Sequence, residues 1–104
     1  MANWNATMDR EIATRLRIAI EDEDAEGVLV ELANAWKWIA QHFERTGRKE
    51  SYDYSIAQDY AKEAEDMLED MRSCSDWYDA DDVDSELAEL YGFCDDLRIW
   101  IPTF

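Results

Sequence analysis

The chain of 104 residues has few basic side chains, few helix breakers and almost no ligands for transition metals. Ten lysines and arginines stand against 26 acids, which gives a net charge of −16 and a pI near 4.1. That charge excludes electrostatic attraction to DNA, RNA or anionic lipid, because those surfaces are also negative. Three glycines and one proline argue against a turn-rich β-sandwich or barrel. One histidine and two cysteines leave little for a zinc site or a disulfide framework.

Export and membrane signals are also missing. The first ten residues, Met1 to Arg10, have neither a basic start nor an apolar run, unlike a signal peptide. The longest apolar run is too short to cross a bilayer. We therefore expect a cytoplasmic protein, in the bacterial host if a phage encodes it, with no membrane partner. Cys74 and Cys94 form no Cys-x-x-Cys pair, and Cys94 lies on an apolar helical stripe, where we expect it to be buried.

Four amphipathic segments are present, and 47% hydrophobic residues suffice for the core of one domain over residues 1–104. The first predicted helix runs from Asn5 or Thr7 to about Asp22, and the second runs from a cap at Asp24 to a stop at Gly47. The third starts at Ser51 or at a capping box at Ser55 and ends at a connection over residues 73–79. The fourth starts at Asp79 or Asp81 and continues through Ile101 to just before Pro102. Gly92 lies inside the last helix, where it could permit a close helix approach or a kink. The predicted fold class is an all-α compact bundle of about four helices.

Charge is divided unevenly along the chain. Residues 1–49 hold nine acids and seven bases, whereas residues 50–104 hold seventeen acids and three bases. Solubility alone needs only a few units of net charge, which could be spread over the surface. This concentration is the strongest functional signal in the sequence.

Helical spacing arranges many of these acids in rows. The third predicted helix carries one row, the fourth carries a second, and the connection between them adds acids beside two aromatics. These candidate partner-binding residues are Asp59, Glu63, Asp66 and Asp70; Asp82, Glu86 and Glu89; and Asp76, Trp77, Tyr78 and Asp79. Neighbouring carboxylates in a row lie about 5–6 Å apart, close to the phosphate spacing of a nucleic-acid strand. The aromatics could anchor on a partner.

In size, charge and helicity, the chain resembles the small acidic helical inhibitors that phages and mobile elements direct against CRISPR or restriction enzymes. We therefore expect a nucleic-acid mimic that occupies the basic groove of a nucleic-acid-binding protein, such as a CRISPR effector, and binds no nucleic acid itself. Charge reversal in these rows is then expected to weaken binding more than reversal at Glu11, Glu21 or Glu31.

Three other interpretations remain open. The chain could be an acidic adaptor, an antitoxin-like neutraliser or an assembly protein that binds a basic partner without mimicking nucleic acid. The acidity could instead be a solvated surface of the halophilic type, although the near-neutral first half argues against that. Seam-like apolar spacing on two helices also allows a homodimer.

Catalysis and cofactors are not expected. His42 lies near a predicted helix end with no second histidine to form a metal pair. The acidic stretch from Asp79 to Glu86 departs from a calcium loop, because Val83 takes the fifth position and Asp84 replaces the sixth-position glycine.

Overall fold

Helices account for nearly all of the regular structure. The computed structural model describes residues 6–73 and 80–102. Its elements are β1 (Ala6–Thr7), α1 (Arg10–Glu21), α2 (Ala25–Arg45), α3 (Tyr52–Ser73), α4 (Ala80–Asp96) and β2 (Ile99–Trp100). The predicted all-α bundle of four helices is confirmed, with one addition: β1 and β2 form a short parallel pair that joins the two ends of the chain.

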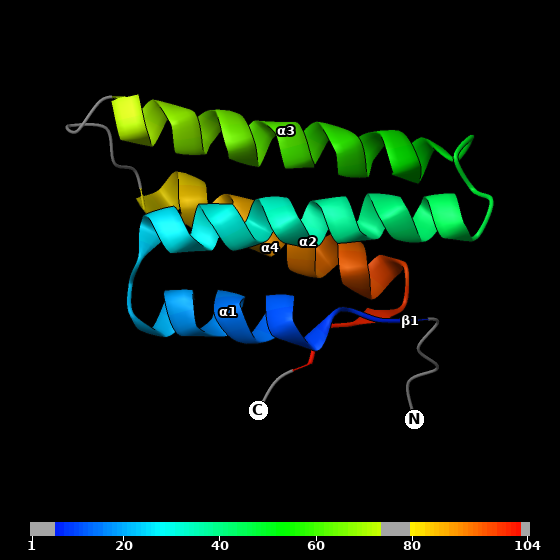
Figure 1. Cartoon of the computed structure of the whole chain (residues 1–104), viewed down its shortest axis with the longest axis horizontal. Helices are drawn as coiled ribbons and strands as arrows, with labels where there is room; N and C mark the ends of the chain where they lie inside the picture. The colour runs from blue at the N-terminus through cyan, green and yellow to red at the C-terminus, as the bar shows by residue number, and fades with distance from the viewer. Residues whose placement is uncertain (1–5, 74–79, 103–104) are drawn as a thin grey trace.

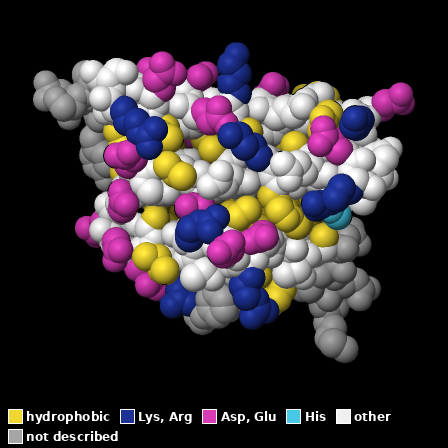
Figure 2. Space-filling view, in the orientation of Figure 1, with side chains coloured by type: hydrophobic (Ala, Val, Ile, Leu, Met, Phe, Trp, Pro, Cys, Tyr) yellow, Lys and Arg dark blue, Asp and Glu magenta, His cyan; other side chains and the backbone are white. Residues whose placement is uncertain are grey.

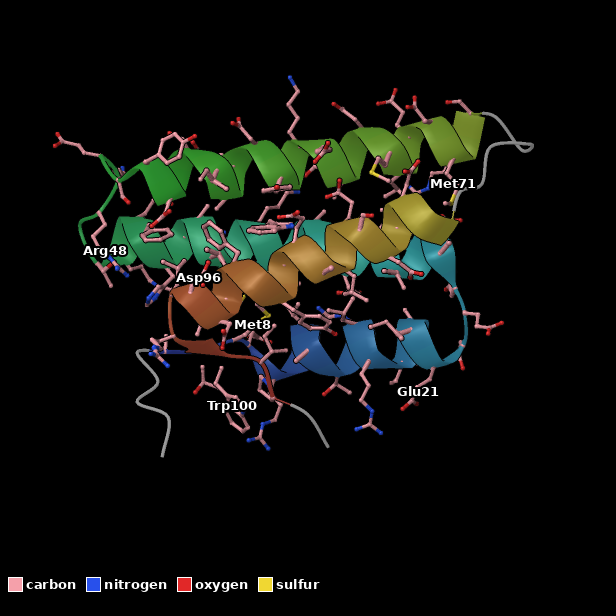
Figure 3. The ribbon with its side chains drawn as sticks, turned by 180° about the vertical axis from the view of Figure 1, so that it is seen from behind. Met8, Glu21, Arg48, Met71, Asp96 and Trp100 are labelled. Carbon is pink, nitrogen blue, oxygen red and sulfur yellow. The ribbon has the colours of Figure 1, made fainter. Side chains whose placement is uncertain are left out.

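The helices form a layer of three with the fourth across its back. Consecutive helices run in opposite directions, and α4 crosses behind α2 (Figure 1); Figure 3 shows the same arrangement from behind. The shortest dimension of the molecule is 20 Å, about two helix diameters. Because direction alternates, the α1–α2 turn, the end of α3 and the start of α4 lie at one end of the molecule.

The core is organised around α2, which packs against each of the other three helices. Trp36 on α2 is fully buried. Its indole stacks on the ring of Tyr60 from α3 with 4.7 Å between centroids, and meets the edge of Phe93 from α4 at 5.1 Å. One side chain thus joins three helices.

The ends of the first two helices follow from their capping residues. Asp9, not Asn5 or Thr7, caps α1: its carboxylate accepts hydrogen bonds from the amides of Glu11 and Ile12. The predicted earlier start is wrong because Thr7 belongs to β1. The predictions for α2 are confirmed, since the Asp24 carboxylate accepts from the Gly27 amide at 3.1 Å and Gly47, with a φ of 72°, follows the helix end.

The third helix begins after Ser51, whose hydroxyl accepts from the amide of Asp53. Ser51 was one of the two predicted starts, and the capping box at Ser55 is wrong.

The fourth helix begins within its predicted range but ends at Asp96, short of the predicted end. Residues 99–100 pair with β1 instead, which satisfies their backbone groups, and proline at 102 disfavours helix at the residue before it. A Cβ at Gly92 would have no neighbour within 4 Å, so this glycine permits no close helix approach.

Candidate partner-binding surface

The predicted carboxylate row on α3 is a continuous feature of one helix. Its members Asp59, Glu63, Asp66 and Asp70 all lie within α3 and are all exposed. Asp59, Asp66 and Asp70 form no ion pair within the described residues, whereas Glu65 beside the row binds Lys37 of α2. We call these four residues the α3 row. The charges of Asp59, Asp66 and Asp70 are available to a partner, whereas Glu63 also interacts with Glu86 of α4.

The acids predicted for α4 are divided between solvent and the seam with α3. Asp82 and Glu89 are exposed, and Glu89 accepts a hydrogen bond from the Tyr60 hydroxyl at 3.2 Å. Glu86 is half-buried, and one of its carboxyl oxygens is sealed from solvent with no partner among the described residues. Burial, a hydrogen bond to Glu63 and the nearby negative charge raise the pKa of Glu86 to about 7. Glu86 therefore contributes less to the exposed field than its place in the sequence predicts.

This seam makes stability depend on pH. The ordinary pKa of a glutamate near 4.5 applies to the unfolded chain, so the folded protein holds the Glu86 proton more tightly and loses stability as pH rises through about 7. We expect Glu86→Gln to stabilise the fold at pH 8 by about 1 kcal/mol, a value reduced for solvent screening of the partly exposed carboxyl. This corresponds to a Tm increase of about 4–8 °C.

Thermal unfolding at pH 5 and pH 8 measures the effect. At pH 5, just above the ordinary glutamate pKa of 4.5, the difference between the variant and the wild type is expected to be less than about a third of that at pH 8. Glu69→Gln, at an exposed position of α3, removes the same charge and is the control. Equal shifts at both pH values, or an equal shift in the control, would disprove the role assigned to the carboxyl pair.

A second group of acids combines residues from both halves of the sequence, so comparing the net charges of the two halves did not reveal it. Nine exposed carboxylates lie at the end where α1 meets α2, α3 finishes and α4 starts. They are Glu21, Asp22, Glu23, Asp24, Glu26, Glu69, Asp70, Asp82 and Asp84. We call this group the acidic end. Acidic side chains follow the corresponding edge of the molecule in Figure 2.

Two exposed ion pairs offset part of the charge of the acidic end. Arg72 of α3 pairs with Glu26 of α2 at 2.9 Å, and Arg17 pairs with Glu21 along α1 at 3.1 Å. The opposite end carries three bases from the last residue of α2 and the α2–α3 turn, beside the exposed acids Glu50, Asp95 and Asp96; the bases are Arg45, Arg48 and Lys49. Charges of both signs thus offset one another at this end, whereas the acidic end is strongly negative. The sequence contained a signal for the acidic end, because alternating helices place the first and third connections at the same end.

Glu23 occupies a backbone position that normally favours glycine. Its φ is 56°, and the amides of Glu23 and Asp24 donate to the carbonyls of Ile20 and Ala19, which is a Schellman motif. The same motif ends α2, where the amides of Gly47 and Arg48 donate to Glu44 and Phe43. The chain thus carries a carboxylate at one of two equivalent turns and glycine at the other.

Replacing Glu23 with glycine is expected to stabilise the fold by about 1 kcal/mol, because it relieves the left-handed backbone conformation. The reverse change, Gly47→Glu, is the matched control and is expected to destabilise by a similar amount. Urea unfolding measures both. A loss of stability in Glu23→Gly would mean that the carboxylate supports the turn, contrary to the geometry.

Glu11, Glu21 and Glu31, named above as sites where charge reversal should affect partner binding less, are unsuitable as controls. Glu31 is buried, and both of its oxygens accept from the Arg15 guanidinium at 3.1 Å, with Asn34 as a further donor. Glu11 also pairs with Arg15, and Glu21 belongs to the acidic end. Glu31 was not anticipated as a buried ion-pair residue. Its position on the face of α2 that packs on α1 was the sequence feature that could have indicated this burial.

His42 and Cys94, also considered in the sequence analysis, pack within the fold. His42 is half-buried and stacks on Trp38 with 5.5 Å between ring centroids; burial and the charges of Arg48 and Arg45 lower its pKa. Cys94 is buried as predicted, and burial raises its pKa to about 12. Within residues 6–73 and 80–102, no group of His, Cys, Asp and Glu side chains is arranged to hold a metal ion.

Four predicted contact residues cannot be placed. Asp76, Trp77, Tyr78 and Asp79 lie outside the described residues, so they stay a prediction.

None of the helices in the described part of the chain combines the length and apolar character that a membrane span requires. No protein-family model, curated protein sequence or solved structure gives a significant match to this chain.

Proposed function

We propose that this protein binds a basic partner by presenting the α3 row and the acidic end to the cationic groove with which that partner binds nucleic acid. The supporting observation is the gathering of exposed carboxylates from both halves of the sequence at one end of the fold, next to the α3 row. Like charges packed this closely repel one another. A positively charged groove would relieve that repulsion on binding.

Inhibition of the partner would follow from occupation of its nucleic-acid-binding groove. A helix that carries carboxylates at about 5–6 Å intervals matches the charge spacing of a phosphate backbone and can use the same lysine and arginine contacts. While it is bound, nucleic acid is kept out both sterically and electrostatically. A CRISPR effector or a restriction enzyme is the proposed type of target, and the protein would act as an anti-defence inhibitor in the cytoplasm of a bacterial host.

Competition with nucleic acid tests this proposal. The full chain is immobilised, a partner is captured from a bacterial lysate and identified by mass spectrometry, and duplex DNA or guide RNA is added in excess. We expect nucleic acid to release the partner, and binding to weaken as salt rises, because exposed charge pairs are screened over about 8–10 Å. A partner that nucleic acid does not displace would exclude mimicry.

A second candidate function is an adaptor, antitoxin-like or assembly protein that binds a basic protein without imitating nucleic acid. The observation that favours it is an apolar recess within the acidic end, lined by Ile20, Val28 and Leu87 among others. A phosphate mimic needs no such feature. Competition by nucleic acid separates the two functions, since only the mimic is displaced.

A further inference from the structure

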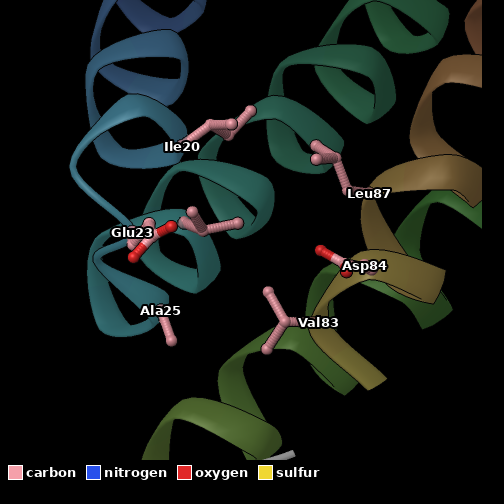
Figure 4. Close-up of a pocket in the computed structure, with 7 residues that line it drawn as sticks. Ile20, Glu23, Ala25, Val83, Asp84 and Leu87 are labelled. Carbon is pink, nitrogen blue, oxygen red and sulfur yellow. The ribbon is translucent and has the colours of Figure 1, made fainter. Parts of the chain in front are cut away.

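A recess of about 450 Å³ lies between the α1–α2 turn and the first turns of α4 (Figure 4). Its apolar lining comes from Ile20, Ala25, Val28, Val83 and Leu87. Val28 and Val83 are buried, while Ile20, Ala25 and Leu87 are half-buried and leave apolar surface open to solvent. The volume is within the range of protein pockets that accept a ligand group.

Two carboxylates from different elements complete the lining. Glu23 belongs to the α1–α2 turn and Asp84 to α4, and both are exposed. Neither forms an ion pair within the described residues. Asp22, Asp24 and Asp82 extend the negative charge on both sides. The recess therefore combines an apolar interior with a rim of unpaired acids from two directions.

We propose that this recess receives a large aliphatic side chain of the partner, presented between lysine or arginine residues. The aliphatic group removes the exposed surfaces of Ile20, Ala25 and Leu87 from water, while the flanking cations reach Glu23 and Asp84. This inference rests on the binding of a basic partner, which both candidate functions share, because it specifies the part of that partner that enters the acidic end.

Charge decides among possible occupants. An acidic or uncharged apolar segment would leave the rim carboxylates facing apolar groups or like charge, which is unfavourable. A second copy of this chain carries the same charge of −16, so self-association through this end would be opposed by repulsion. A segment with cations on both sides of an aliphatic residue satisfies the interior and the rim together.

Synthetic peptides test the proposal without the partner. The probe is a nine-residue peptide with a central leucine between two pairs of arginines. One comparison peptide replaces the leucine with alanine, and another replaces the arginines with glutamates. Binding to the full chain is followed by fluorescence anisotropy, and the site by NMR shifts of the methyl groups of Ala25, Val83 and Leu87. We expect the leucine peptide to bind about tenfold more tightly than the alanine peptide, which corresponds to the burial of three carbon atoms less some solvent exposure. The glutamate peptide is expected not to bind.

A variant with a filled recess locates the site. Ala25→Leu adds bulk to the recess wall and is expected to reduce leucine-peptide affinity at least about tenfold. The matched control is Ala40→Leu, the same change at a half-buried position of α2 that faces a different recess; it is expected to leave affinity unchanged. Circular dichroism establishes that both variants are folded.

Three results would overturn the inference: equal binding of the leucine and alanine peptides, equal effects of the two variants, or a wild-type dimer in sedimentation that Ala25→Leu dissociates. The last would make a second copy the occupant. These results are independent of nucleic-acid competition for a captured partner, so failure of this inference and failure of the proposed function are distinguishable.

Discussion

Reversing three charges of the α3 row is expected to weaken partner binding by about 100-fold. The variant Asp59→Lys, Asp66→Lys and Asp70→Lys changes only exposed residues with no ion pair in the described structure. Each reversal replaces an attraction with a repulsion worth about 1 kcal/mol at an exposed site, and 1.4 kcal/mol is a tenfold change in affinity. Most of the loss is expected at low salt, where screening is weak.

A triple variant at the opposite end is the matched control. Glu50→Lys, Asp95→Lys and Asp96→Lys change the net charge by the same amount at exposed positions. Figure 3 places Asp96 at the same end as Arg48, away from Glu21 and Met71. Affinity for the captured partner is measured by surface plasmon resonance at two salt concentrations. If both triple variants lose affinity equally, net charge is responsible, and the localised surface has no special part.

Replacing Trp36 with alanine is expected to destabilise the fold by about 3–5 kcal/mol. The indole is fully buried and contacts Tyr60 and Phe93, so its removal leaves a cavity where three helices meet. A domain of this size has a total stability of about 5–15 kcal/mol. The variant is therefore expected to melt roughly 15–30 °C below the wild type.

Trp38→Ala is the control for this effect. Trp38 is only half-buried and stacks on His42 of the same helix, so we expect less than half of the loss seen at Trp36. Trp36→Phe should also lose less, because phenylalanine keeps the ring contact and removes a buried indole N–H that has no partner among the described residues. Urea unfolding compares the three variants. Similar losses for Trp36→Ala and Trp38→Ala would contradict the central position of Trp36.

Local chemistry predicted much of the fold. Asp24 and Gly47 were readable as the ends of α2 because a side-chain acceptor and a left-handed turn act on neighbouring residues. The end of α4 was not readable. It depends on pairing between Ile99–Trp100 and Ala6–Thr7, and no local pattern reports contacts between the two ends of a chain.

The candidate surface was predictable along a helix but not across helices. The α3 row follows directly from helical spacing, and all of its members are exposed. The contact between Glu63 and Glu86 depends on how α4 lies against α3, which the spacing within either helix does not specify. The acidic end likewise adds Glu21–Asp24, residues that belong to the nearly neutral half of the sequence.

Amide hydrogen exchange of the captured complex tests most directly whether the clustered carboxylates form the contact surface. Exchange is compared in the free and partner-bound protein, with peptides covering each helix. We predict slower exchange in the bound state over the α1–α2 turn, α3 from Asp59 onward and the first turns of α4. Protection confined to the middle of α1 and to the α2–α3 turn, with the acidic end unchanged, would contradict the account.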